Sequence, residues 1–280
     1  MRNALELTGM PTRPMDLYLE TSGACLRYRD EGRGCAVILV HGWTLDLEQW
    51  ESQAAALATE FRVVRLDRRG FGLSSGLPSI AGDGADLLAL CNHLGFDSAA
   101  LVGMSQGARV VLQFAKSHPR KTSCLILDGP PHLGAGGSHD IPYKHYRELA
   151  QTQGLSAFRR EWSEHALARL RTSAPETHAL LARMIASYPG RDLTDTAGHA
   201  DAMPLDQGFE SVDRPTLVIN GEFDLDSRKR FAAQLASQLP RAECVEIPDA
   251  GHLCNLDNPR AYNDAVKRFL ERHAFPSTDH

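Results

Sequence analysis

A serine stands between a strand pattern and a helix pattern near the middle of the chain, in a G-x-S-x-G sequence at residues 103–107. Residues 99–102 form an apolar run typical of a buried strand, and the apolar residues after Gly107 recur at helical spacing. A sharp strand-to-helix turn strains its central residue and tolerates only small flanking residues. The motif alone could be an ordinary tight turn, but its position predicts that Ser105 stands exposed above the edge of a sheet.

Short apolar segments alternate with helix patterns along the chain. Strands are expected at residues 15–19, 24–28, 36–40, 61–66, 99–102, 124–127, 215–220 and 244–247. Helices are expected at residues 45–59 and 86–94, from residue 107, at residues 227–239, and from Pro259, with Asn258 as the cap of this last helix. The first two strands form a hairpin, and the later alternation predicts a mostly parallel eight-stranded sheet with helices on both faces.

The alternation stops after the sixth strand. Between residues 132 and 208 no strand-type run occurs, and helix patterns are expected at residues 143–151, 155–170 and 176–188. Helices inserted at the active-site end of a sheet are most simply a lid over a pocket, although a surface insertion without a role is the alternative. Glycines at residues 134–138 suggest a hinge. The predicted organisation is a core at residues 14–131 and 209–273 with a helical lid at residues 132–208.

Composition excludes several classes of function. The formal charge of −5 is spread over 280 residues and provides no basic patch for nucleic acid. The first 20 residues contain no continuous apolar stretch, which predicts neither a signal peptide nor a membrane span and hence a cytoplasmic protein. The six cysteines are scattered without a C-x-x-C pair and are interpreted as reduced thiols.

Cofactor and metal sites are not expected. The groups His139/His145 and Cys244/His252/Cys254 lack the ligand spacing of a zinc site. A dinucleotide site is excluded because the G-x-S-x-G sequence has a serine where the G-x-G-x-x-G pattern needs its second glycine.

Three polar residues follow three separate strands in the order Ser105, Asp224, His252. A serine hydroxyl needs a base to take its proton, and an imidazole serves best when a carboxylate fixes its tautomer and stabilises its charged form. Asp128, which also follows a strand, and Asp226 are the alternative acids. The position at the strand end favours Asp224, since Asp226 can instead cap the next helix.

A second candidate segment is His41-Gly42-Trp43, directly after the strand at residues 36–40. A glycine past a central strand lets the backbone approach a ligand, and the next backbone N–H can then point into the pocket. A plain turn is the alternative. The loop at residues 67–74 is interpreted as structural, because Asp67 and the arginines of the loop can hold it in place through charge-assisted hydrogen bonds.

Together these segments resemble the α/β-hydrolase superfamily over residues 15–272. The likeness rests on residues 41–43, 67–74, 103–107, 221–224 and 251–252. It implies the α/β-hydrolase fold, a mostly parallel eight-stranded sheet flanked by helices with a helical lid after the sixth strand. Residues 220–228 and 251–259 are most similar to the branch that contains 3-oxoadipate enol-lactone hydrolases and carboxylesterases.

The resemblance also implies roles for individual residues. Ser105 would be the nucleophile, His252 the base and acid, and Asp224 the orienting carboxylate. The backbone N–H groups of Trp43 and Gln106 would form the oxyanion hole. Beyond these, the substrate pocket is expected to include His41, Gly42, Met104, Phe158 and Trp162.

The leading functional hypothesis is hydrolysis of a small carboxylic ester or lactone through an acyl-enzyme, with no cofactor and with neither nucleic acid nor a membrane as a partner. Two alternatives remain open. The same triad could cleave a C–C bond in a ring-cleavage product, or the protein could be a receptor that binds its ligand with slow or no turnover.

Overall fold

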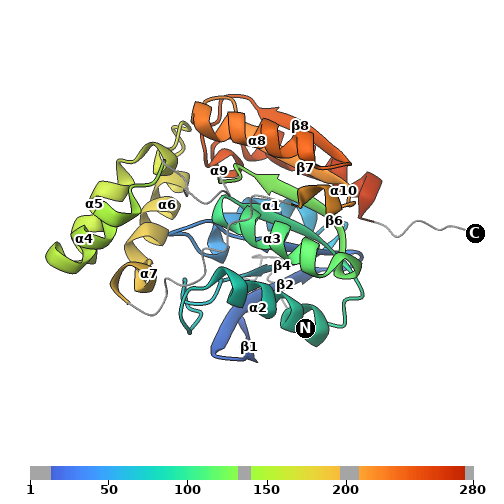
Figure 1. Cartoon of the computed structure of the whole chain (residues 1–280), viewed down its shortest axis with the longest axis horizontal. Coiled ribbons are helices and arrows are strands. Elements are labelled where there is room, and N and C mark those ends of the chain that lie inside the picture. The colour runs from blue at the N-terminus through green and yellow to red at the C-terminus, as the bar shows by residue number, and fades with distance from the viewer. Residues whose placement is uncertain (1–13, 132–139, 196–207, 275–280) are drawn as a thin grey trace, which may run out of the picture.

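A single sheet of eight strands runs through the molecule in the order β1-β2-β4-β3-β5-β6-β7-β8 (Figure 1). This computed structural model describes residues 14–131, 140–195 and 208–274. The strands are β1 (Leu17–Thr21), β2 (Ala24–Gly32), β3 (Ala36–Val40), β4 (Arg62–Leu66), β5 (Ala99–Met104), β6 (Thr122–Asp128), β7 (Thr216–Gly221) and β8 (Ala242–Ile247). Strand β2 pairs antiparallel with β1 and β4, and all other neighbours are parallel. The predicted fold class is confirmed.

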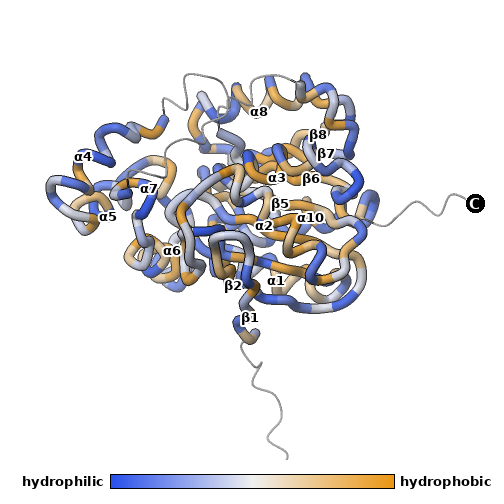
Figure 2. The backbone as a smooth tube through the Cα atoms, turned by 60° about the horizontal axis from the view of Figure 1, so that its bottom comes forward, coloured by the Kyte–Doolittle hydropathy of each residue, from blue (hydrophilic) through white to orange (hydrophobic). Residues whose placement is uncertain are grey.

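Helices cover both faces of the sheet because its central strands are apolar on both sides. Every residue of β3 and β5 is buried, and Figure 2 shows hydrophobic residues concentrated in the central strands. The helices beside the sheet are α1 (Glu51–Leu57), α2 (Ile80–His93), α3 (Gln106–Ser117), α8 (Asp226–Gln238) and α10 (Pro259–His273). Val37 and Leu39 of β3 pack with α1 and α10, whereas Ile38 and Val40 pack with α2 and α3.

The expected helices of the insertion (residues 132–208) are present. Helices α4 (Tyr143–Gln153), α5 (Leu155–Ser163), α6 (Pro175–Ser187) and α7 (Arg191–Thr194) form a group at one side of the sheet (Figure 1). Their apolar side chains share one core cluster with residues that follow β3, including Trp43 and Leu45. The glycine-rich hinge expected at residues 134–138 lies outside the described residues.

Several predicted helix boundaries are wrong. The helix expected at residues 45–59 is a 3-10 turn (Leu47–Trp50) followed by α1, since Asp46 caps the turn through a hydrogen bond from the N–H of Glu48. The helix expected at residues 155–170 ends at Ser163, and the short helix α7 was not predicted. Helix α2 begins at Ile80 rather than at residue 86 because the Ser79 hydroxyl caps it.

Two predicted helix caps have opposite outcomes. Asn258 caps α10 as expected, because its side-chain oxygen accepts a hydrogen bond from the N–H of Ala261 at 3.2 Å. Asp226 does not cap α8. It is the first residue of that helix, and the capping position belongs to Leu225.

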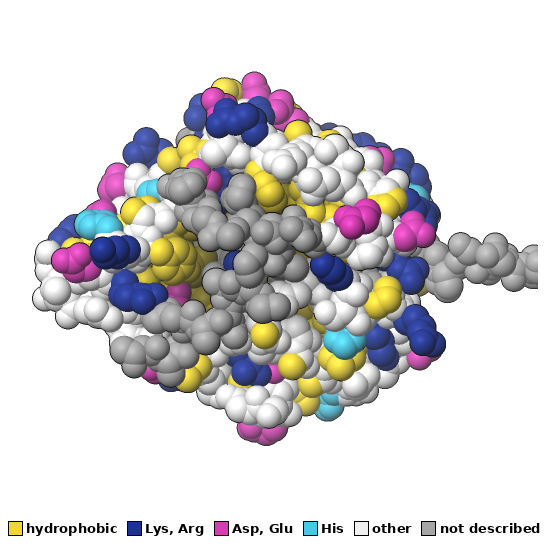
Figure 3. Space-filling model, in the orientation of Figure 1, with side chains coloured by type: hydrophobic (Ala, Val, Ile, Leu, Met, Phe, Trp, Pro, Cys, Tyr) yellow, Lys and Arg dark blue, Asp and Glu magenta, His cyan; other side chains and the backbone are white. Residues whose placement is uncertain are grey.

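Charged side chains of both signs are interspersed over the molecular face in Figure 3. Within residues 14–131, 140–195 and 208–274, no helix has the length and apolar character needed to cross a membrane.

Candidate active site

Ser105 occupies a strained turn between β5 and α3. Its φ of 51° and ψ of −116° lie outside the regions that residues with a side chain normally favour. The prediction that Ser105 stands exposed is wrong: the residue is only 7% exposed, because it lines a pocket between the sheet and the insertion. A Cβ on Gly103 would collide with the carbonyl of Gly107, and one on Gly107 would collide with the carbonyl of Val40. Both glycines of the motif are therefore required. The backbone of the turn is also held by a hydrogen bond, since the N–H of Ser105 donates to the Asp128 carbonyl at 2.7 Å.

Asp224 and His252 meet at the carboxyl ends of β7 and β8. The distances from His252 Nδ1 to Asp224 Oδ2 and Oδ1 are 3.0 and 3.2 Å, and both side chains are buried. Asp224 also accepts hydrogen bonds from the side chain of Asn220 at 3.1 Å and from the N–H of Leu225 at 2.8 Å. Burial by itself would raise the pKa of Asp224, but His252 and these donors hold it below its ordinary value. Asp224 is therefore an ionised partner for the imidazole.

The two other candidate acids do not occupy this position. In the described structure His252 Nδ1 hydrogen-bonds Asp224, whereas the Asp128 carboxyl accepts from the Cys254 thiol at 3.1 Å. Burial, together with the nearby charge of Asp224, raises the pKa of Asp128 to about 8. Asp226 is exposed at the start of α8.

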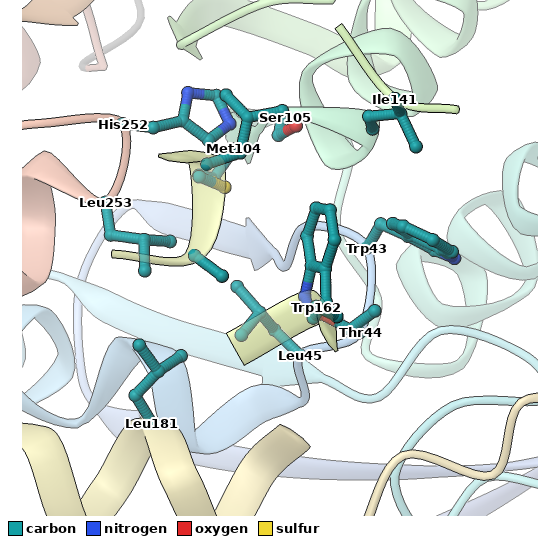
Figure 4. Close-up of a pocket in the computed structure, with 12 residues that line it drawn as sticks. Trp43, Thr44, Leu45, Met104, Ser105, Ile141, Trp162, Leu181, His252 and Leu253 are labelled. Carbon is teal, nitrogen blue, oxygen red and sulfur yellow. The ribbon is translucent and has the colours of Figure 1, made fainter. Parts of the chain in front are cut away.

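One pocket is lined by both Ser105 and His252, which lie close together at one end of it (Figure 4). Its lining is mostly apolar and comes from both the sheet and the insertion: Trp43, Thr44, Leu45, Met104, Ser105, Ile141, Trp162, Leu167, Ala168, Leu181, His252 and Leu253. Among the described residues, no Asp, Glu, Lys or Arg side chain belongs to this lining. The described part of the lining therefore offers mainly apolar contacts to a bound molecule.

Of the five predicted pocket residues, the lining includes Met104 and Trp162 but not the other three. Phe158 packs behind the residues that line the pocket. Its ring centroid lies 5.6 Å from that of Trp43 and 6.4 Å from that of Trp162, on which it stacks. It is fully buried on the inner face of α5, which helical spacing alone does not distinguish from a lining position.

His41 and Gly42 are also outside the lining. Their polar groups form hydrogen bonds within the core. His41 Nε2 accepts from the N–H of Arg68 at 2.9 Å, and the N–H of Gly42 donates to Gln49 at 3.2 Å. Burial, assisted by the charge of Arg68, lowers the pKa of His41 to about 3, so this imidazole stays neutral. Sequence reasoning missed Leu181 and Leu253, whose only signal was an apolar position within or beside a helix.

Trp43 lines the same pocket as Ser105, and Gln106 directly follows Ser105 in the chain. Gln106 is the first residue of α3, so its backbone N–H is one that the helix leaves without an internal partner. Its side chain accepts a hydrogen bond from Arg68 at 2.7 Å, and Arg68 in turn pairs with Asp83. Trp43 lines the pocket three residues after the end of β3. The arrangement can bring two backbone donors toward a carbonyl oxygen above Ser105.

No group of three potential metal ligands occurs among the described residues. Of the side chains considered for zinc, Cys244 is exposed on β8, Cys254 is buried against Asp128, and His139 lies outside the described residues.

The loop at residues 67–74 has the predicted structural role, because Asp67 accepts from the N–H groups of Leu47 and Leu73.

Comparison with known proteins places this geometry in a family. The sequence model of the alpha/beta hydrolase fold matches residues 36–259, and the chain therefore belongs to that family. A thermophilic esterase from Thermogutta terrifontis is 28% identical with a TM-score of 0.81, covering 92% of this chain and 98% of its own. The enol-lactonase from Burkholderia xenovorans is 26% identical with a TM-score of 0.78, covering 91% and 100%. The pimeloyl-[acyl-carrier protein] methyl ester esterase of Cronobacter sakazakii is 27% identical, covering 92% and 98%.

Proposed function

We propose that the protein is a serine hydrolase that cleaves a small carboxylic ester or lactone through an acyl-enzyme. The observation that carries the proposal is the Asp224–His252 hydrogen bond, at 3.0 Å, beside a strained Ser105 that opens into the same pocket. The similarity to an esterase, an enol-lactonase and a methyl ester esterase supports the same class of reaction.

In this mechanism His252 takes the proton of Ser105 as the hydroxyl oxygen attacks the substrate carbonyl. The backbone N–H groups of Trp43 and Gln106 stabilise the resulting oxyanion. His252 then donates the proton to the leaving alcohol, and a water activated by the same imidazole releases the acid. Asp224 stays ionised throughout and stabilises the imidazolium, which agrees with its lowered pKa.

The insertion is proposed as the lid of this pocket, with the core at residues 14–131 and 209–273. Residues 132–208 contribute a substantial part of the pocket lining, including Trp162, Leu167, Ala168 and Leu181. Since this lining is apolar, it favours a neutral and compact acyl or alcohol group over a charged one.

The proposal is tested by measuring the turnover of four substrates by the wild-type protein and by Ser105→Ala. The substrates are p-nitrophenyl acetate, p-nitrophenyl butyrate, a lactone and a vinylogous diketone. Ser105→Ala should lose ester and lactone turnover while keeping its melting temperature, because the covalent route disappears and a small side chain suits the turn. Ser237→Ala, an exposed serine on α8, is the matched control and should match wild type. Near-wild-type activity of Ser105→Ala would remove Ser105 from the mechanism, and tight ligand binding with negligible wild-type turnover would favour a receptor.

A further inference from the structure

The side chain of Trp43 is held almost entirely by the insertion. Its ring packs against Tyr143 of α4 and against Trp162 and Phe158 of α5, with centroid distances of 4.7, 4.8 and 5.6 Å. Its indole N–H donates a 2.6 Å hydrogen bond to the carboxylate of Asp192 on α7. A residue that follows a core strand is thereby connected to a side chain 149 positions further along the chain.

The Asp192 carboxylate is well suited to hold an indole in one orientation. It is 8% exposed, and its second oxygen accepts from the hydroxyl of Tyr188. Burial and the neighbouring Asp192 charge raise the pKa of Tyr188 well above its ordinary value, so this hydroxyl remains a donor. Hydrogen bonds to a charged acceptor are stronger than neutral ones, and losing one inside the protein leaves a costly unpaired group.

The backbone next to Trp43 is strained and is also tied to the insertion. Thr44 has a φ of 63°, an unfavourable conformation for a β-branched residue. The indole nitrogen of Trp162 points to Thr44 and donates to its hydroxyl at 2.8 Å (Figure 4). Two successive residues after β3 are therefore hydrogen-bonded to the insertion: Trp43 donates to α7, and Thr44 accepts from α5.

We infer that Asp192 is a positioning residue, which acts through the Trp43 side chain to aim the Trp43 backbone N–H at the developing oxyanion. This inference rests on the proposed function. It means that the insertion contributes to the chemical step in addition to shaping the pocket. Because an oxyanion forms only in the transition state, loss of this support should lower kcat and leave KM little changed.

The test compares the full-length wild type with Asp192→Ala, Asp192→Asn and Arg191→Ala, using p-nitrophenyl butyrate turnover and melting temperature. Asp192→Ala removes the acceptor and should lower kcat about tenfold or more, given that deletion of a complete oxyanion donor costs about 10²–10³-fold. Asp192→Asn keeps an oxygen that can accept from Trp43 and should retain most of kcat. Arg191 ties the same helix to the carbonyl of Gly76 at 3.0 Å, so Arg191→Ala controls for a general loosening of α7 and should leave kcat unchanged.

Trp43→Phe removes the indole N–H from the other side and decides the question if Asp192→Ala does not fold. It should lower kcat comparably, and Asp192→Ala should add little to it, because both changes break one interaction. An unchanged kcat in Asp192→Ala, a loss confined to KM, or losses that multiply in the double variant would overturn the inference. Absence of turnover in the wild type itself would instead refute the proposed function, so the two failures are distinguishable.

Discussion

Asp128 and Asp224 show how strongly the immediate surroundings of a residue decide its chemistry. Asp128 is the last residue of β6, Asp224 follows the neighbouring parallel strand β7, and both residues are buried. Asp224 has an imidazole, an amide and a backbone N–H as partners, and its pKa lies below the ordinary value. Asp128 has the Cys254 thiol as a donor and the charge of Asp224 nearby, and its pKa rises to about 8. One carboxyl is ionised at neutral pH, whereas the other is mostly protonated.

This contrast predicts different effects on activity. Asp224→Asn should lower kcat for ester hydrolysis severely, up to about 10⁴-fold, because the amide does not hold His252 in the required tautomer or stabilise its charge. Asp128→Asn, which resembles the protonated acid in shape, should change kcat only slightly. Steady-state kinetics of both folded variants provide the measurement. A crippled Asp128→Asn beside a mild Asp224→Asn would reverse the assignment of the acid.

At the scale of an element, helix α6 presents two large buried residues that lie one turn apart but differ in their surroundings. Both residues belong to the shared core cluster, but Leu181 also lines the pocket, whereas Met184 is not among the lining residues. Both are buried, with exposures of 6% and 2%. The helix therefore carries a substrate-facing position and a matched packing position.

Shortening Leu181 should change specificity. Leu181→Ala enlarges the pocket and should shift the kcat/KM ratio of longer to shorter p-nitrophenyl esters toward the longer ones, by about 1–3 kcal/mol. Met184→Ala should lower the free energy of unfolding by about 2–5 kcal/mol and leave the ratio unchanged. A chain-length series and urea unfolding of both variants separate the effects. An unaltered substrate preference in folded Leu181→Ala would contradict the assignment of α6 to the binding site.

On the scale of the whole molecule, the sheet and the insertion are held together by apolar packing and by polar ties at their boundary. One hydrophobic cluster contains residues of α1, α10 and the insertion helices. Arg228 of α8 pairs with Asp140 at 2.8 Å, and Asp257 accepts from the backbone of Arg171 at 2.6 Å. The position of the insertion against the sheet therefore depends on both kinds of contact.

The global stability should depend on pH through Asp128. Its pKa is about 8 in the folded protein and near 3.8 in the unfolded chain, so the folded state binds the proton more tightly. The stability linked to this proton is fully present below about pH 4 and is lost as pH rises toward 8. The free energy of unfolding of Asp128→Asn should consequently fall less steeply between pH 5 and 8 than that of wild type. Parallel slopes for the two proteins in urea unfolding would contradict this expectation.

Local sequence determined the strand and helix alternation and the strained turn at Ser105. Apolar runs and their spacing follow from the geometry of strands and helices, and only glycine fits where the carbonyls of Val40 and Gly107 approach so closely. The order of Ser105, Asp224 and His252 after three separate strands could also be predicted, because parallel strands place their carboxyl ends along one edge.

Only the tertiary structure decided which apolar residues reach the pocket and which polar groups meet inside the core. Leu181 and Phe158 have the same local pattern, yet one faces the pocket and the other lies behind Trp43. The contact of Trp43 with Asp192 joins distant segments, and α7 itself is only four residues long. Such contacts depend on how helices pack and on which side chains are desolvated together, and neither property has a periodic signature in the sequence.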